Sequence, residues 1–172
     1  MSSFTVPTTQ PRSPRELHCP IALWRRLLVS LRERGHQGEH ESGAFLLGER
    51  DDARARITDF VLYDDLDRRS LDSGIVRFDG RYYGALWDRC RRDRISVVAD
   101  VHTHPFGAGQ SPSDRAHPMV SAPGHIALIL PHFAMCEMSV VEVGMYHYLG
   151  AKRWYTVPIH ERELFLKLQS GG

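Results

Sequence analysis

The chain has few cysteines, no long apolar run and almost no net charge, and each shortage excludes a class of protein. Its three cysteines, Cys19, Cys90 and Cys136, lie far apart and in no metal-binding spacing, which predicts reduced thiols. No apolar run reaches the ~18 residues that span a bilayer, and no signal-peptide core stands near the N-terminus. A net charge of +1 disfavours nucleic acid and membrane surfaces as partners. We therefore expect a cytoplasmic protein.

The composition is that of a globular domain. Apolar residues make up 42% of 172 residues, which is enough for a core and favours a single domain. Residues 1–17 are rich in Ser, Thr and Pro and predict a flexible tail, the domain is expected over 18–160, and 161–172 form a C-terminal segment. That segment ends in Gly171-Gly172, which we interpret as part of a flexible tail.

Apolar periodicity predicts two main helices and a set of strands. Helix 21–34 has one apolar face, made by Trp24, Leu27, Leu28 and Leu31. A second helix is expected at 79–93, with Asp79 as its N-cap, and a short one near Ser113 or Asp114. The segment 64–73 is expected to be a loop. Strands are predicted at 42–48, 54–63, 96–104, 125–130, 137–143, 145–149 and 153–157. The result is an α/β (α+β) fold with a mixed sheet flanked by helices.

His102-Thr103-His104 is the pattern that carries chemistry. Two histidines two residues apart on a strand point to the same face, so both imidazoles can bind one metal ion. Asp114 follows a loop rich in Gly and Pro that can return the chain and add a carboxylate. Three protein ligands leave one tetrahedral position open for water, as in catalytic zinc sites.

Hydrolysis also needs a base and an oxyanion donor. Glu41, at the start of an apolar strand, is the preferred base, and Glu39 in the polar stretch before it is the alternative. Ser111 can donate a hydrogen bond to the oxyanion. Asp100 shares strand parity with both histidines, and it either holds a histidine ring as an acceptor or pairs with an arginine.

These residues, in this order and spacing, resemble the JAB/MPN metallopeptidases that carry the JAMM motif. The resemblance rests on His102-x-His104-Pro105, Ser111-x-x-Asp114 and the upstream Glu41, and it spans about residues 21 to 157. One departure is Ala44, where many members have Gly, but no catalytic group is lost. Other His-x-His enzymes, such as metallo-β-lactamases and cupins, require ligands that the residues after His104 do not supply.

The resemblance implies a single-domain JAB/MPN fold with a curved mixed sheet, and roles for each residue. His102, His104 and Asp114 would bind one Zn²⁺, Glu41 would be the general base and Ser111 would assist the oxyanion. The implied reaction is hydrolysis of the amide after the C-terminal Gly-Gly of a ubiquitin-like protein or its conjugates. Compact bacterial members act with E1- and E2-like proteins in conjugation and anti-phage pathways, which are the expected partners and setting.

Two other functions remain open on the same residues. One is a peptidase that processes a sulfur-carrier protein, which also ends in Gly-Gly. The other is a non-catalytic binding module of the same fold, although members without metal usually lose a ligand and this chain has kept all three.

Overall fold

The computed structural model describes residues 14–170. One eight-stranded sheet runs through it, in the order β7-β6-β5-β4-β2-β3-β1-β8. The strands are β1 (Glu16–Pro20), β2 (Gly43–Arg50), β3 (Arg54–Leu62), β4 (Ser96–Thr103), β5 (Ile126–Leu130), β6 (Gly144–Gly150), β7 (Arg153–Thr156) and β8 (Leu166–Gln169). The sheet is mixed, because β4 is parallel to β5 and β1 is parallel to β3 and β8, while the other pairs are antiparallel. The predicted fold class is confirmed.

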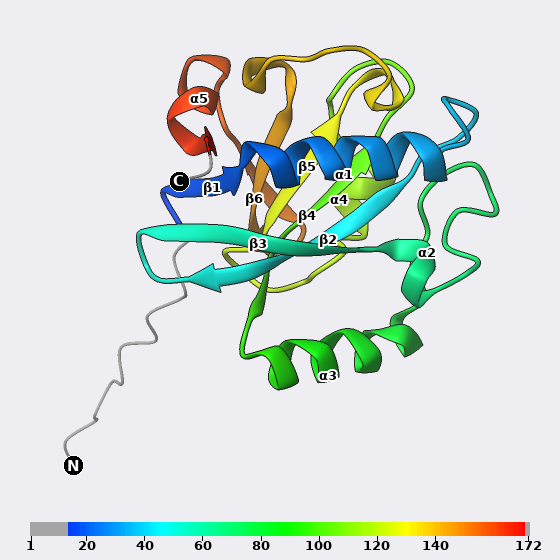
Figure 1. Ribbon diagram of the computed structural model, residues 1–172, viewed down its shortest axis with the longest axis horizontal. Coiled ribbons are helices and arrows are strands. Elements are labelled where there is room, and N and C mark those ends of the chain that lie inside the picture. Colours follow the sequence, from blue (N-terminus) through cyan, green and yellow to red (C-terminus); the bar gives the residue numbers. More distant parts are fainter. Residues whose placement is uncertain (1–13, 171–172) are drawn as a thin grey trace.

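Helices cover both faces of the sheet, α1 on one and α3 on the other (Figure 1). The longer helices are α1 (Ile21–Arg34) and α3 (Tyr83–Asp93). The short ones are α2 (Tyr63–Leu66), α4 (Pro112–Ala116), α5 (Arg162–Phe165) and the 3-10 turns η1 (Gly80–Tyr82), η2 (His132–Ala134), η3 (Val140–Glu142) and η4 (Ile159–Glu161). No helix within residues 14–170 is long and apolar enough to cross a membrane.

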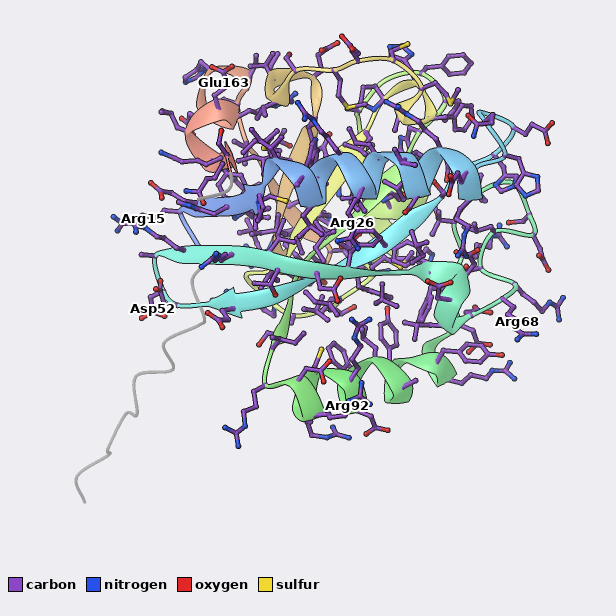
Figure 2. The ribbon with its side chains drawn as sticks, viewed as in Figure 1. Arg15, Arg26, Asp52, Arg68, Arg92 and Glu163 are labelled. Atoms are coloured by element: carbon purple, nitrogen blue, oxygen red, sulfur yellow. The ribbon has the colours of Figure 1, made fainter. Side chains whose placement is uncertain are left out.

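Period-two alternation along the strands divides the core between the two helices. On β2, Ala44 and Leu46 belong to the cluster that packs under α1, while Phe45 and Leu47 belong to the cluster that packs on α3. Figure 2 shows side chains filling the space on both sides of the sheet, with Arg26 labelled on α1 and Arg92 on α3. Every residue of β5 is buried, as its uninterrupted apolar run predicted.

Most predicted elements are confirmed. The helix at 21–34 is α1, and the predicted strands other than 137–143 correspond to β2 through β7. The helix predicted at 79–93 begins with the turn η1, where the Asp79 side chain accepts a hydrogen bond from the N–H of Arg81, and continues as α3. The short helix predicted near Ser113 or Asp114 is α4.

The strand predicted at 137–143 is wrong. This segment contains the 3-10 turn η3, with Ser139 before it and Glu142 at its end. The N–H of Ser139 donates to the Glu142 carboxylate at 2.7 Å, so a local capping box satisfies the backbone that a strand would have paired. The loop expected at 64–73 is also corrected at its start, where α2 includes Asp64, Asp65 and Leu66.

β1 begins inside the predicted N-terminal tail, and β8 lies within the predicted C-terminal segment. Residues 16 and 17 were assigned to the N-terminal tail but open β1, where Leu17 is buried and pairs with β3 and β8. Residues 166–169 of the C-terminal segment form β8. The rest of the expected tails, residues 1–13 and Gly171-Gly172, lies outside the described residues.

Candidate metal centre

The two histidines stand where β4 ends, in the middle of the sheet. His102 pairs with Gly43 of β2. His104 lies just past the strand, where its N–H donates to the carbonyl of Leu130 at 2.9 Å and its carbonyl accepts from the N–H of Phe133 at 2.8 Å. Both backbone positions are therefore fixed by neighbouring strands and turns, which places the two histidines side by side before any ligand binds.

Asp114 reaches the histidines because α4 begins with a capping box. Ser111 is the N-cap, and its Oγ accepts a hydrogen bond from the N–H of Asp114 at 3.1 Å. In return, the N–H of Ser111 donates to Asp114 Oδ2 at 2.6 Å. Pro112 occupies the first turn, where its missing N–H costs nothing. The carboxylate is thus held by the same turn that brings the chain back from the loop.

Three side chains converge on one point. Nε2 of His102 lies 3.0 Å from Nε2 of His104. Asp114 Oδ1 lies 3.4 Å from Nε2 of His102, and Oδ2 lies 3.2 Å from Nε2 of His104. All the candidate ligand atoms fall within 4.8 Å of one another. Two imidazole nitrogens and a carboxylate form a donor set that fits a divalent metal ion such as zinc.

The two imidazoles of the group attract the carboxylate, and this attraction shifts the pKa values of Asp114 and His102. Burial alone raises the pKa of Asp114, but hydrogen bonds from His102 and His104 outweigh it and hold the pKa well below its usual range. Burial lowers the pKa of His102, and the nearby Asp114 carboxylate raises it above its ordinary value. Asp114 therefore stays ionised, as a metal ligand must.

The structure brings Glu41 to this group and leaves Glu39 outside it. Glu41 Oε1 lies 4.0 Å from Nε2 of His104, and Oε2 accepts a hydrogen bond from the N–H of Val76 at 3.1 Å. The Glu41 side chain is 14% exposed, whereas that of Glu39 is 76% exposed and faces His36. Of the two predicted alternatives for the base, only Glu41 has its carboxylate close to the candidate ligands.

Asp100 does not support either metal histidine. Its Oδ1 lies 2.6 Å from Nε2 of His125, and its Oδ2 accepts a hydrogen bond from the hydroxyl of Tyr63 at 3.1 Å. The expected contact to His102 or His104 is therefore corrected. Strand parity gave the right face, but His125, which lies just before β5, takes the carboxylate.

A cavity of about 530 Å³ adjoins the metal group and was not predicted. His102 and Asp114 line it together with side chains from four other segments, including Phe78, Tyr83 and Trp154. These segments are far apart in the sequence, and no spacing between them indicates a common wall. Only the three-dimensional arrangement reveals it.

Comparison with known proteins finds a distant relative that is named a probable metalloprotease. No family model matches. The chain is 27% identical over 128 residues to a protein of Sinorhizobium fredii named probable metalloprotease y4jG, covering 74% of this chain and 78% of that protein. The printed name of this distant relative fits the His102, His104 and Asp114 group, whose side chains could hold a metal ion.

Solved structures share the fold. The solution structure of a Desulfitobacterium hafniense protein superposes with a TM-score of 0.62 at 14% identity, over 90% of this chain and 94% of that one. A Salinibacter ruber protein gives a TM-score of 0.53 at 17% identity, over 82% of this chain and 88% of its own. At these identities the likeness concerns the architecture alone.

Proposed function

We propose that this protein is a zinc-dependent peptidase of the JAMM type. The observation that carries the proposal is the convergence of His102, His104 and Asp114, with the Glu41 carboxylate 4.0 Å from His104. The distant probable metalloprotease supports the same class. When bound at the three side chains, zinc supplies Lewis acidity, which lowers the pKa of water and polarises a carbonyl.

The protein's own residues supply the proton transfers and the orientation. Glu41 accepts a proton from the attacking water and returns it to the leaving amine. The hydroxyl of Ser111 uses its oxygen to cap α4, so its proton remains free to hydrogen-bond the oxygen of the attacked carbonyl. Asp114 is held ionised by its neighbours and keeps the group's net charge suited to a cation.

For the substrate, we propose the amide that follows the C-terminal Gly-Gly of a ubiquitin-like protein, in a conjugate or a precursor. This choice comes from the resemblance of the motif to JAB/MPN peptidases. An extended Gly-Gly tail can bring its carbonyl close to the metal group because it carries no side chains. In a bacterial conjugation pathway, with E1- and E2-like partners, such an enzyme would deconjugate or process the modifier.

The test is cleavage of a ubiquitin-like protein fused through Gly-Gly to a reporter. We expect cleavage after the second glycine, identified by mass spectrometry, which stops on chelation and returns with zinc. Chelator-resistant cleavage would contradict the metal-dependent reaction. Cleavage at another bond would keep the peptidase and overturn the Gly-Gly substrate.

A further inference from the structure

The cavity beside the metal group is large enough to hold a substrate side chain. Its volume of about 530 Å³ falls within the ~300–1,000 Å³ typical of ligand pockets. Because His102 and Asp114 contribute to its wall, it opens directly onto the reacting centre. The apolar part of its lining consists chiefly of Phe78, Tyr83, Met119, Ala127, Ile129 and Trp154.

Hydrogen bonds between the segments that line this cavity hold its walls in place. The hydroxyl of Tyr83, on α3, donates to the carbonyl of Met119 and so joins the two walls. Trp154, on β7, donates its Nε1 proton to the carbonyl of Arg115 at 3.1 Å and ties α4 to the sheet. Ala127 and Ile129, both on β5, contribute to the lining from the sheet. The pocket is therefore preformed, which favours specific binding.

Two buried donors that line the cavity have no partner in the described part of the chain. One is Nε2 of Gln110 and the other is Nδ1 of His102. The Gln110 amide cannot be turned around, because its Oε1 accepts a hydrogen bond from the Arg115 guanidinium, which only donates. Leaving a buried N–H unpaired is costly, so a turn of the Gln110 side chain that brings its N–H to an acceptor on a molecule in the cavity would be favourable.

A Gly-Gly tail cannot fill such a space. Glycine has no side chain, so the two acyl-side residues next to the proposed bond would leave the apolar walls beside the metal group without contacts. The amine side, which leaves after hydrolysis, is the part of the substrate free to carry a large group. The residue that follows Gly-Gly is therefore the one whose side chain can fill the cavity.

We propose that the cavity binds the residue on the amine side of the scissile amide and selects a large apolar side chain there. Gln110 is a positioning residue that donates a hydrogen bond to the backbone carbonyl of that residue. This specificity rests on the proposed peptidase function and applies to its precursor substrates, in which it favours Gly-Gly followed by a residue such as Phe or Leu rather than by a small one.

The first test is a series of ubiquitin-like fusions ending Gly-Gly-X, with X as Gly, Ala, Leu or Phe. We expect kcat/KM to be about tenfold or more higher for Leu and Phe than for Gly, because filling an apolar pocket gives discrimination of this order. A flat profile, or a preference for the small residues, would overturn the proposal.

Ala127→Phe fills the cavity from β5 and should abolish the preference for large X while zinc content stays the same. Ala85→Phe adds the same ring on the exposed side of α3 and should leave the preference intact. If Ala127→Phe fails to fold by circular dichroism, Met119→Trp narrows the same cavity from a loop. A preference that survives in the folded filling variant would contradict the assignment.

Gln110→Glu tests the hydrogen bond with almost unchanged shape. The variant keeps an acceptor for Arg115 but loses the N–H, so KM for the Phe substrate should rise about tenfold with little change in kcat. An unchanged KM would remove Gln110 from the site.

Measurements of peptide binding test the proposed cavity independently of the proposed peptidase activity. Calorimetry compares Gly-Gly-Phe and Gly-Gly-Gly peptides on zinc-loaded Glu41→Gln, with and without Ala127→Phe. If no fusion is hydrolysed by the wild-type protein but the Phe peptide binds about tenfold tighter only to the open cavity, the pocket stands and the proposed activity falls. Equal binding of the two peptides overturns the pocket, whatever the hydrolysis result.

Discussion

Asp114 shows how one residue can serve both folding and a metal site. Its Oδ2 accepts the N–H of Ser111 at 2.6 Å, which caps α4, and also lies 3.2 Å from Nε2 of His104. The helix cap and the ligand position are therefore set by the same side chain. A carboxylate at this position stabilises the turn whether or not an ion is present.

Removal of a ligand should separate metal binding from folding. We expect His102→Ala to lower zinc affinity more than roughly a hundredfold, since even groups that only support ligands contribute ~10–100-fold. Asp114→Asn should do the same while keeping an oxygen for the helix cap. Zinc titration monitored by competition with a chelating dye measures both variants, and stoichiometric tight zinc in either one would contradict the ligand set.

His147 should make stability depend on pH. Burial among Tyr155 and Phe165 lowers its pKa to about 4, and Nε2 is buried with no partner among the described residues. Since an unfolded histidine has a pKa near ~6.5, the unfolded chain binds more protons between these values. The free energy of unfolding is therefore unaffected by the titration of His147 above about pH 6.5, and it falls by up to roughly 3 kcal/mol as the pH drops to about 4.

The measurement is urea unfolding at pH 7.5 and pH 4.5 for the wild type and His147→Phe. The variant should lose less stability on acidification than the wild type, because its buried ring has no proton to gain. Equal losses in the two proteins would show that His147 does not contribute.

At the scale of elements, the loop between β4 and α4 depends on β6. The hydroxyl of Tyr146 donates to the carbonyl of Ala108 at 2.6 Å, and a Cβ added to Gly144 would overlap that same carbonyl. The loop therefore lies directly on the backbone of β6. Because Ser111 and Asp114 follow this loop, the close contact between the loop and β6 determines where these two residues lie.

Gly144→Ala should lift the loop and weaken the metal site. We expect a destabilisation of roughly 1–3 kcal/mol, typical of overpacking, together with weaker zinc binding. Gly109→Ala, in the same loop but with open space around its Cβ position, is the matched control and should change neither. Thermal melts and zinc titration of both variants measure this, and unaltered zinc affinity in Gly144→Ala would refute the coupling.

Sequence patterns predicted the elements whose signal is local. Periodicity within one segment predicts the apolar face of α1, the strands of the hairpin of β2 and β3, and the shared face of His102 at the end of β4 and His104 just past it. The 3-10 turn at Val140–Glu142 was missed because two valines favour a strand, while the capping box that decides the outcome depends on Ser139 and Glu142. Asp100 was placed on the right face, but its partner His125 lies in a distant segment, just before β5.

At the scale of the whole molecule, the sheet is completed by strands with no clear signal of their own. β1 and β8 are parallel neighbours from opposite ends of the described chain. Their short sequences include His18, Pro20 and Lys167, and only long-range pairing makes them strands. The cavity beside the metal group likewise joins several distant segments. Such features depend on tertiary contacts that a local pattern does not contain.

Zinc should stabilise the whole domain. A ligand that binds only the folded state adds ~2.7 kcal/mol at a free concentration a hundredfold above its Kd. For a domain of this size that corresponds to a rise in Tm of about 5–10 °C. Differential scanning calorimetry with and without zinc measures it, and the rise should be absent in His102→Ala.

The central claim is that Glu41 is the base beside a zinc ion held by His102, His104 and Asp114. The most direct measurement is zinc content and hydrolysis of the Gly-Gly fusion in the same samples of wild type, Glu41→Gln and Glu39→Gln. The account predicts one zinc per chain in all three, with turnover lost only in Glu41→Gln, by roughly 100-fold or more. Undiminished turnover in Glu41→Gln, or wild-type protein that binds no zinc, would contradict it.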